Sequence, residues 1–217
     1  MEITDVSEVI VQKKPASYYP HIKRFLDISI SIIGIAALSP LLLLVVLLIK
    51  LEDPEGEVLF KQQRVGKDGK LFHMYKFRSM VSNAEALKVT LMDKNEATGP
   101  VFKIRYDPRV TRVGSFIRKT SIDELPQLIN VLKGEMTLVG PRPALPDEVE
   151  KYTDFERQRI TVTPGLTCYW QVSGRNNIGF DEWVQLDLQY IRERSVLIDL
   201  KLIFRTVFVL FGSKDAC

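Results

Sequence analysis

Cysteine is scarce in this chain of 217 residues, which contains only Cys168 and Cys217. Two cysteines so far apart provide neither a disulfide framework nor the ligand cluster of a zinc site, and they fit a reducing compartment. Cys217 is the last residue, so it is not the fourth-from-last cysteine of a prenylation signal. An excess of charge is also missing, because a formal net charge of +3 is too small to indicate nucleic-acid binding by itself.

Long uncharged runs are absent from residues 51–217, but one such run, residues 28–49, precedes them. Its length and composition are typical of a transmembrane helix. It begins too late and is too long to be the hydrophobic part of a cleavable signal peptide. The whole chain is 46 % hydrophobic and 26 % charged, which together with its length predicts one principal folded domain.

Ser39 and Pro40 divide this apolar run into two halves. Each half is about 15 Å long as a helix, roughly half of the hydrocarbon thickness, so a helix-break-helix hairpin that enters and leaves on one side is feasible. Basic residues flank both ends, which does not indicate the asymmetry of a simple span. The residues alone leave the hairpin and a kinked span both open.

Asp27 lies at the edge of the apolar run. An acid near a membrane boundary usually has a basic partner, and Lys23 and Arg24 are the nearest candidates. The alternative is a solvated acid at the start of a helix.

Residues 58–80 alternate apolar and polar side chains around a turn at residues 67–69, which predicts a β-hairpin. Its second arm carries Lys76 and Arg78 close together. The two cations form either an anion site or an ordinary solvated face. Residues 82–94 are predicted to be helical.

Ser121 and Glu124 fit a capping box, followed by apolar residues at helical spacing as far as Gly134. This predicts one helix with Asp123 and Glu124 in its first turn. The helix dipole would favour ionised carboxylates there and would also attract anions. Acids in a first turn are ordinary, so this pattern alone does not identify a site.

Arginines near this pair strengthen the case for phosphate chemistry. Arg118 precedes Asp123, and Arg142 is held between two prolines, which restrict the backbone and aim one guanidinium. Arg175 lies in a predicted turn at residues 173–176. Carboxylates beside fixed arginines suggest phosphoryl transfer with a divalent metal.

Tyr169 and Trp170 lie between these arginines in the sequence. They either stack on a base, lie at a membrane interface or pack in the core. Two helices are predicted near the end, at about 181–193 and 196–211. The second is mostly apolar and fits either a membrane interface or the core.

Six motifs in order resemble the bacterial sugar transferase family, the monotopic phosphoglycosyl transferases that begin glycan assembly on polyprenyl phosphate. They are KRFLD (23–27), the Ser39-Pro40 pair, KFRSM (76–80), RKTSIDELPQLINVLKGEMTLVGPRP (118–143), PGLT (164–167) and SGRN (173–176). The resemblance covers nearly the whole chain and implies its minimal catalytic form. Cys168 and Tyr169 depart from the Gly-Trp that many members carry after PGLT, which puts the sugar or base preference in doubt.

The resemblance implies transfer of a sugar 1-phosphate from a UDP-sugar to polyprenyl (undecaprenyl) phosphate with release of UMP. It assigns Asp123 as the nucleophile that forms a phosphosugar intermediate, Glu124 as its partner, and Mg2+ at Asp123. Arg118, Arg142 and Arg175 would hold phosphates and nucleotide, and Lys76 and Arg78 would assist them.

The resemblance also implies a mixed α/β fold, mostly helical, with a re-entrant hairpin that breaks at Ser39 and Pro40. We therefore expect a tail over 1–20, a re-entrant membrane helix over 21–50 and a membrane-associated catalytic domain over 51–217, on the cytoplasmic face of a bacterial inner membrane. Homo-oligomerisation is left open.

Two other classes compete with this interpretation. One is a membrane-anchored scaffold that binds a nucleotide sugar without catalysis, against which the intact Asp123–Glu124 pair argues. The other is a single-span protein with a nucleic-acid-binding domain, against which the weak net charge and the lack of a basic-aromatic stripe argue. We expect no nucleic-acid partner.

Overall fold

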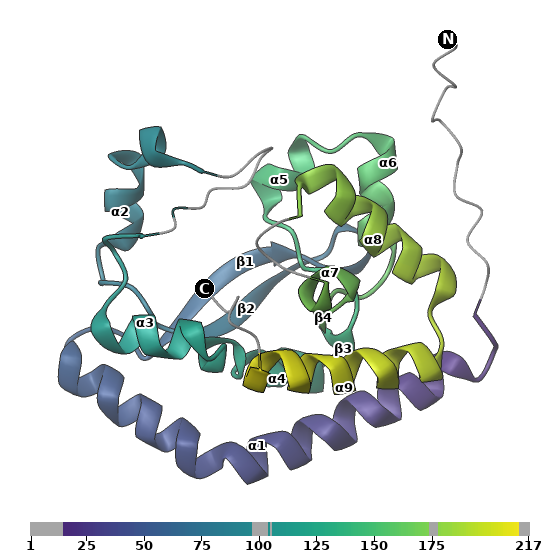
Figure 1. Ribbon diagram of the computed structural model, residues 1–217, viewed down its shortest axis with the longest axis horizontal. Helices are drawn as coiled ribbons and strands as arrows, with labels where there is room; N and C mark the ends of the chain where they lie inside the picture. Colours follow the sequence, from purple (N-terminus) through teal and green to yellow (C-terminus); the bar gives the residue numbers. More distant parts are fainter. Residues whose placement is uncertain (1–14, 97–103, 105, 174–177, 213–217) are drawn as a thin grey trace.

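The computed structural model describes residues 15–96, 104, 106–173 and 178–212. It is a mixed and mostly helical fold, as the sequence predicts (Figure 1). The elements run in the order α1 (Tyr19–Glu52), β1 (Leu59–Val65), η1 (Lys67–Gly69), β2 (Leu71–Phe77), α2 (Ala84–Val89), η2 (Met92–Lys94), α3 (Arg112–Lys119), η3 (Ile122–Glu124), α4 (Gln127–Lys133), β3 (Thr137–Val139), α5 (Pro146–Glu150), α6 (Asp154–Arg157), η4 (Gln158–Thr161), β4 (Gly165–Thr167), α7 (Tyr169–Val172), α8 (Phe180–Glu193) and α9 (Val196–Gly212).

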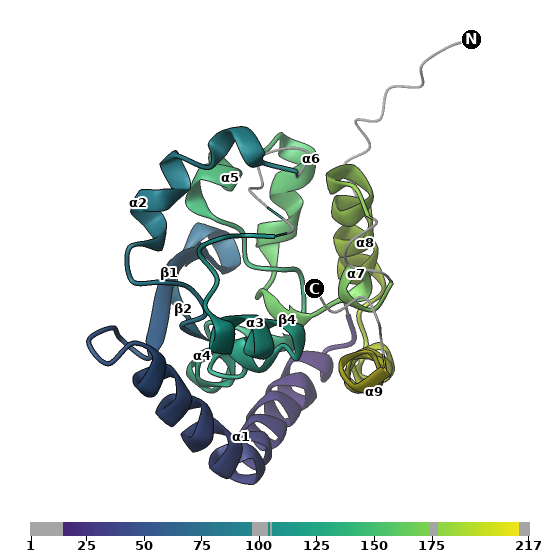
Figure 2. The ribbon, with the colours of Figure 1, turned by 60° about the vertical axis from the view of Figure 1, so that its left-hand side comes forward.

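Helix α1 is continuous over 34 residues and contains Pro40, so the predicted separation into two helices is wrong. The helix bends near its middle instead, as Figures 1 and 2 show from two directions. Proline removes one helical hydrogen bond and bends the axis without ending the helix. The hydroxyl of Ser39 donates to the carbonyl of Ala36 at 2.8 Å, which makes use of a backbone acceptor beside the bend.

Both arms of α1 pack against the same domain. In the first arm, Ile30 and Ile35 contact the main apolar core, which is centred on residues such as Val131 and Met136. In the second arm, Val45 and Ile49 form a smaller core with Phe77 and Ile117 and with partly buried neighbours. The bend therefore turns the two halves of one helix toward a single body.

Much of the apolar surface of α1 remains exposed. The helix is long and apolar enough to cross a membrane, and only 11 % of its most apolar stretch is buried. Leu43 is 70 % exposed and Ile33 is 66 % exposed. A soluble helix of this composition would bury such side chains, so this surface indicates membrane association.

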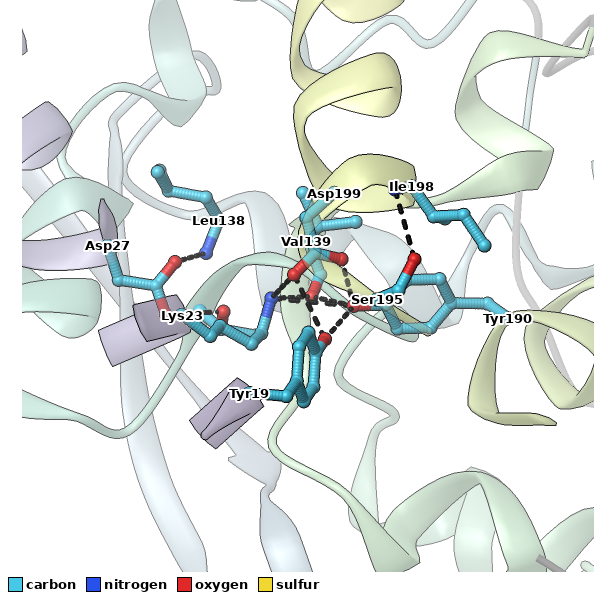
Figure 3. Close-up of polar contacts among 10 residues, drawn as sticks. Tyr19, Lys23, Asp27, Leu138, Val139, Tyr190, Ser195, Ile198 and Asp199 are labelled. Atoms are coloured by element: carbon cyan, nitrogen blue, oxygen red, sulfur yellow. Dashed lines mark hydrogen bonds and ion pairs between the residues drawn. The ribbon is translucent and has the colours of Figure 1, made fainter. Parts of the chain in front are cut away.

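A network of polar side chains fixes the first arm (Figure 3). Asp27 accepts hydrogen bonds from the hydroxyl of Thr137 at 2.6 Å and from the backbone N–H of Leu138 at 2.9 Å. The amine of Lys23 lies 2.8 Å from Asp199 of α9. Asp27 is therefore paired with the start of β3, and the predicted pairing with Lys23 or Arg24 is wrong.

Arg24 has a different role, at the end of α4. Its guanidinium donates to the carbonyls of Val131 and Leu132 at 2.6 and 2.7 Å. These carbonyls belong to the last helical turn, where a cation is favourable. Gly134 ends α4 with a φ of 82°, as the sequence predicts, because glycine adopts this conformation at little cost.

Two small sheets lie above α1. Strands β1 and β2 form the predicted antiparallel hairpin, with the turn at Lys67–Gly69. Strands β3 and β4 are parallel. Helices α5 and α6 and the start of α8 lie away from α1, whereas α3, α4 and α9 lie close to it (Figures 1 and 2). The end of α8 also reaches α1, where the hydroxyls of Tyr190 and Tyr19 lie 3.3 Å apart.

Candidate active site

Asp123 is the most informative side chain of the predicted site. It lies in the short turn η3 and is only 7 % exposed. Burial raises the pKa of its carboxyl to about 6, with Glu124 acting in the same direction and Lys76 and Arg118 opposing it. The carboxylate is thus ionised at neutral pH although it is poorly solvated, which suits a nucleophile.

The backbone around Asp123 differs from the predicted capping box. Ser121 has a left-handed backbone with a φ of 54°, and its side chain does not cap a helix. The acids occupy the three-residue turn η3, and α4 begins only after Pro126. Leu125 and Pro126 both have right-handed helical dihedrals, but proline has no backbone N–H to donate, so the helical hydrogen bonds are interrupted at Pro126 and the single predicted helix is divided.

The left-handed residue just before this turn is a strained position. A non-glycine residue in this region costs on the order of 1–3 kcal/mol and is found most often at functional sites. At Ser121 the chain changes direction between α3 and η3. This turn places Asp123 inside the protein while Arg118, on α3, remains exposed.

Lys76 joins the site from the end of β2. Its amine lies 2.8 Å from Oε1 of Glu124, and both side chains are only partly buried. Of the two alternatives for the β2 cations, Lys76 therefore lies beside the carboxylates rather than on a plain solvated face. It neutralises part of the negative charge that the two adjacent acids create.

Arg78 lies elsewhere. Its guanidinium forms an ion pair with Asp53 at 2.9 Å and donates to the Asp53 carbonyl at 3.0 Å. It therefore fastens the segment that follows α1. A phosphate-binding role for Arg78 stays a prediction that this geometry does not favour.

Arg142 lies in the proline-flanked loop that follows β3. Its guanidinium contacts Glu148 at 3.4 Å and lies 5.1 Å from the ring of Trp183. The loop is pressed onto β4, since a Cβ on Gly165 would lie 2.0 Å from the backbone nitrogen of Gly140. Arg175, the third predicted arginine, lies outside the described residues.

The acidic side chains determine where a metal ion can bind. Among the described residues, no group of three or more His, Cys, Asp or Glu side chains forms a site for a metal ion. Mg2+ commonly uses only one or two carboxylates together with substrate phosphates. Asp123 and Glu124 fit this half-site, with Glu124 also engaged by Lys76.

The comparison with known families decides the class of the chain. The model of the bacterial sugar transferase family matches residues 18–213. The chain belongs to this family. The match includes α1, the whole hairpin, the Asp123–Glu124 pair and all of α9, so the candidate site of this sugar transferase lies inside the matched region.

Curated relatives agree with this membership. The chain is 49 % identical over 199 residues to the galactosyl transferase CpsE of Streptococcus agalactiae, covering 90 % of this chain and 44 % of the relative. It is 46 % identical to the undecaprenyl-phosphate galactose phosphotransferase of Salmonella typhimurium, covering 90 % and 41 %. It is 41 % identical to the exopolysaccharide production protein ExoY of Sinorhizobium fredii, covering 85 % and 83 %. The sugar transferase thus spans less than half of the first two relatives and most of the third.

Sequence reasoning missed a second cluster of charged groups behind Arg142. Arg159 and Asp187 form a buried ion pair at 2.8 Å, and Glu148 is 1 % exposed. Trp170 and Trp183 pack with ring centroids 4.8 Å apart. Trp170 is therefore a packing residue, one of the alternatives that the sequence left open.

Arg64 was also missed, although its position carried a signal. It pairs across the hairpin with Phe72, a buried residue, and is itself 5 % exposed. Side chains of a strand alternate between faces, so an arginine opposite a core phenylalanine is expected to point inward.

Proposed function

We propose that this protein transfers a sugar 1-phosphate from a UDP-sugar to undecaprenyl or another polyprenyl phosphate and releases UMP. The observation that carries the proposal is the buried Asp123 carboxylate, held beside the Glu124–Lys76 ion pair in a member of the sugar transferase family. Relatives named as undecaprenyl-phosphate galactose and glucose phosphotransferases support this reaction class. Another is named for N-acetylgalactosamine, so the sugar itself is left open.

The proposed chemistry has two steps. A carboxylate oxygen of Asp123 attacks the phosphorus nearest the sugar, the bond from that phosphorus to the bridging oxygen breaks, and UMP leaves with the electron pair. A phosphate oxygen of the polyprenyl acceptor then attacks the same phosphorus and releases the Asp123 carboxylate. Two displacements at one phosphorus replace a single direct transfer between the two substrates.

The charges around Asp123 and Glu124 support the role of Asp123 as the nucleophile. Two adjacent ionised carboxylates repel each other and would weaken the approach of an anionic donor. Lys76 pairs with Glu124 and lowers the pKa of Asp123, which favours the ionised nucleophile. Arg118 acts on Asp123 in the same direction from the exposed side of α3.

Mg2+ is part of the proposal as a cofactor. Asp123, with Glu124 beside it, would hold the ion together with the diphosphate of the donor. When bound, the ion supplies positive charge that stabilises the developing charge on the transferred phosphate. Asp123 and Glu124 bring the carboxylates, and the arginines orient the remaining phosphate oxygens.

The bent helix supports a re-entrant placement of α1. Both arms contact the same domain, so a straight crossing would separate the second arm from Phe77 and Ile117. The exposed apolar surface around the bend would lie in one leaflet, with the catalytic domain on the cytoplasmic face of the bacterial inner membrane. A lipid-linked acceptor would then reach Asp123 from the membrane, and the soluble donor from the other side.

Intact-protein mass spectrometry tests the function. The purified protein is incubated with Mg2+ and a panel of UDP-sugars without acceptor, and released UMP is assayed in parallel. We expect a mass gain of one phosphosugar, absent from Asp123→Asn, and its loss on addition of polyprenyl phosphate. UMP release that strictly requires the lipid, without an adduct, would contradict the two-step route. Binding of a UDP-sugar without any turnover would favour a scaffold.

A further inference from the structure

Arg64, near the end of β1, is a buried cation whose charge is poorly compensated by its described neighbours. Its Nη1 donates to the carbonyl of Pro143 at 2.9 Å, and its Nη2 donates to the side chain of Gln62. Its Nε is buried without a hydrogen-bond partner. Within the described part of the chain, Arg64 forms no ion pair, although it is only 5 % exposed.

The neighbours of Arg64 make its charge more costly. Burial lowers the pKa of the guanidinium, and Arg142 lowers it further by charge repulsion, whereas Glu148, Glu124 and Tyr152 act the other way. An arginine starts from so high a pKa that it stays protonated at neutral pH. Arg64 and Arg142 are thus two like charges close together in a largely buried place.

Glu148 does not neutralise both of them. Its Oε2 accepts the backbone N–H of Leu145 at 2.9 Å and a long contact of 3.4 Å from Arg142. Its Oε1 is buried and has no hydrogen-bond partner. The third guanidinium nearby, Arg159, has its own carboxylate in Asp187.

Among these described side chains, the guanidiniums of Arg64, Arg142 and Arg159 therefore face the two carboxylates of Glu148 and Asp187, and Glu124, which also acts on Arg64, forms an ion pair with Lys76. Placing an uncompensated charge inside a protein costs several kcal/mol. Replacing buried charged groups with hydrophobic residues of similar volume is often neutral or stabilising. Such an arrangement is suited to an anion that completes the charge balance when it binds.

Arg64 also holds the loop that carries Arg142. Arg64 donates to the Pro143 carbonyl. The next residue, Val65, donates its backbone N–H to the carbonyl of Ala144 at 2.9 Å. The strand end thus fixes the loop on the C-terminal side of Arg142. The Arg142 side chain is 24 % exposed, so of the two arginines it is the one that reaches a ligand.

We propose that Arg64 is a positioning residue for the donor: it fixes the Arg142 loop, and its positive charge behind Arg142 strengthens binding of a phosphate of the nucleoside diphosphate sugar. This inference rests on the proposed function. The donor is favoured over the lipid phosphate because Arg142 contacts α5 and the first turn of α8, which lie away from α1 (Figures 1 and 2). A soluble substrate approaches from that side.

The test compares Arg64→Gln with Arg64→Lys in the full chain, in detergent with Mg2+. Both variants keep a donor near the Pro143 carbonyl, but only lysine keeps the charge. We expect Arg64→Gln to raise the KM for the UDP-sugar and the inhibition constant of UMP by roughly tenfold or more, and Arg64→Lys by less than about threefold. The KM for polyprenyl phosphate should stay within about twofold in both.

Lys61→Gln is the matched control, because Lys61 is an exposed cation of the same strand. It removes the same formal charge and should leave every constant unchanged. Thermal unfolding without ligand separates positioning from a structural role: similar unfolding temperatures for the two variants, with different donor KM values, support the proposal.

Four results would overturn it. These are an unchanged donor KM in Arg64→Gln, an equal rise in both variants, a rise in the acceptor KM instead of the donor KM, and loss of stability without a change in KM. If Arg64→Gln does not fold, Arg64→Lys decides, because a tenfold rise in its donor KM contradicts a role for the charge. If the wild-type protein releases no UMP from any UDP-sugar, the proposed function and this inference both fail. If the wild-type protein is active and one of the four results is found, only the inference fails.

Discussion

The amine of Lys76 lies 2.8 Å from the carboxylate of Glu124, the residue that follows the buried Asp123. This ion pair joins the end of β2 to the turn η3, two segments that are far apart in the sequence. It keeps one of two adjacent carboxylates neutralised while the other, Asp123, has no ion pair with a described residue. The arrangement links the charge state of Asp123 to Lys76, which lowers the pKa of Asp123 more than Arg118 does.

Removing Lys76 should therefore change the pH dependence of activity. In Lys76→Met, the cation that lowers the pKa of Asp123 is lost and Glu124 is left to repel it, so the pKa of Asp123 rises. We expect the acidic limb of kcat against pH to move toward higher pH, with a larger loss at pH 6.5 than at pH 8.5. Steady-state assays of UMP release at several pH values measure this. Lys119→Met, at the exposed end of α3, is a control that should not move the limb.

The wild-type protein should itself lose activity in mild acid. Burial raises the pKa of Asp123 to about 6, and protonation below that pH removes the nucleophile. We expect formation of the phosphosugar adduct to fall as pH decreases through about 6. A rapid-quench measurement of the first turnover checks this, and a flat profile down to pH 4.5 would exclude Asp123 as the titrating group.

Asp123→Asn should make the protein more stable at neutral pH. A carboxyl whose pKa is raised on folding stabilises the folded state only while it is protonated, and that contribution is lost as pH rises through the folded pKa of about 6. We therefore expect Asp123→Asn to stabilise the fold by on the order of 1–3 kcal/mol at pH 8 and by almost nothing near pH 4. Denaturant unfolding at both pH values measures the difference. Equal effects at both values would mean that the gain has another cause.

Asp27 should be a strong stabilising residue despite its place beside an apolar run. Its two oxygens accept the hydroxyl of Thr137 and the N–H of Leu138, and an amide in place of the carboxylate turns one acceptor into a donor. Asp27→Asn is expected to cost about 1–3 kcal/mol, the penalty of an unsatisfied buried group. Thermal unfolding in one detergent measures it. Asp68→Asn, at an exposed position in the hairpin turn, is the control and should cost almost nothing.

Pro40→Ala should straighten α1 and weaken its second arm. Alanine restores the hydrogen bond that proline removes, so the helix gains local stability while Val45 and Ile49 are pulled away from Phe77 and Ile117. We expect a spin label at an exposed site of each arm to report a longer separation, together with reduced activity. An unchanged separation would show that packing alone produces the bend.

The sequence was most informative where local rules decide. Alternation and a glycine-containing turn were enough for the hairpin, and Gly134 was enough for the end of α4, because each depends on residues a few positions apart. The turn at Ser121 did not follow these rules. A capping pattern was present, but Pro126 lacks the N–H that a continuous helix requires. Ser121 has a left-handed backbone, so Asp123 and Glu124 lie in a short turn and not in the first turn of a longer helix. This strain depends on the surrounding structure.

Contacts between residues that are far apart in the sequence could not be predicted from residue spacing. Asp27 and Lys23 are four residues apart, which suggests a local pair, but the fold offers each a buried partner from β3 or α9. The inward position of Arg64 was not predicted, although strand alternation carried a signal for it. The shortage of carboxylates around it becomes visible only when β1, the Arg142 loop and α5 are brought together. Burial and charge balance of this kind are properties of the assembled structure.

The ties of α1 to β3 and α9 have a consequence for biosynthesis. The groups that pair with Asp27 and Lys23 follow them by 110 and 176 positions in the chain. A nascent chain therefore carries Asp27 beside the bilayer without its final partners until β3 has left the ribosome, and Lys23 without its carboxylate until α9 has done so. The first arm reaches its final position only after α9 has been made, so the membrane must hold α1 in a provisional state while the domain that will hold it is still being made.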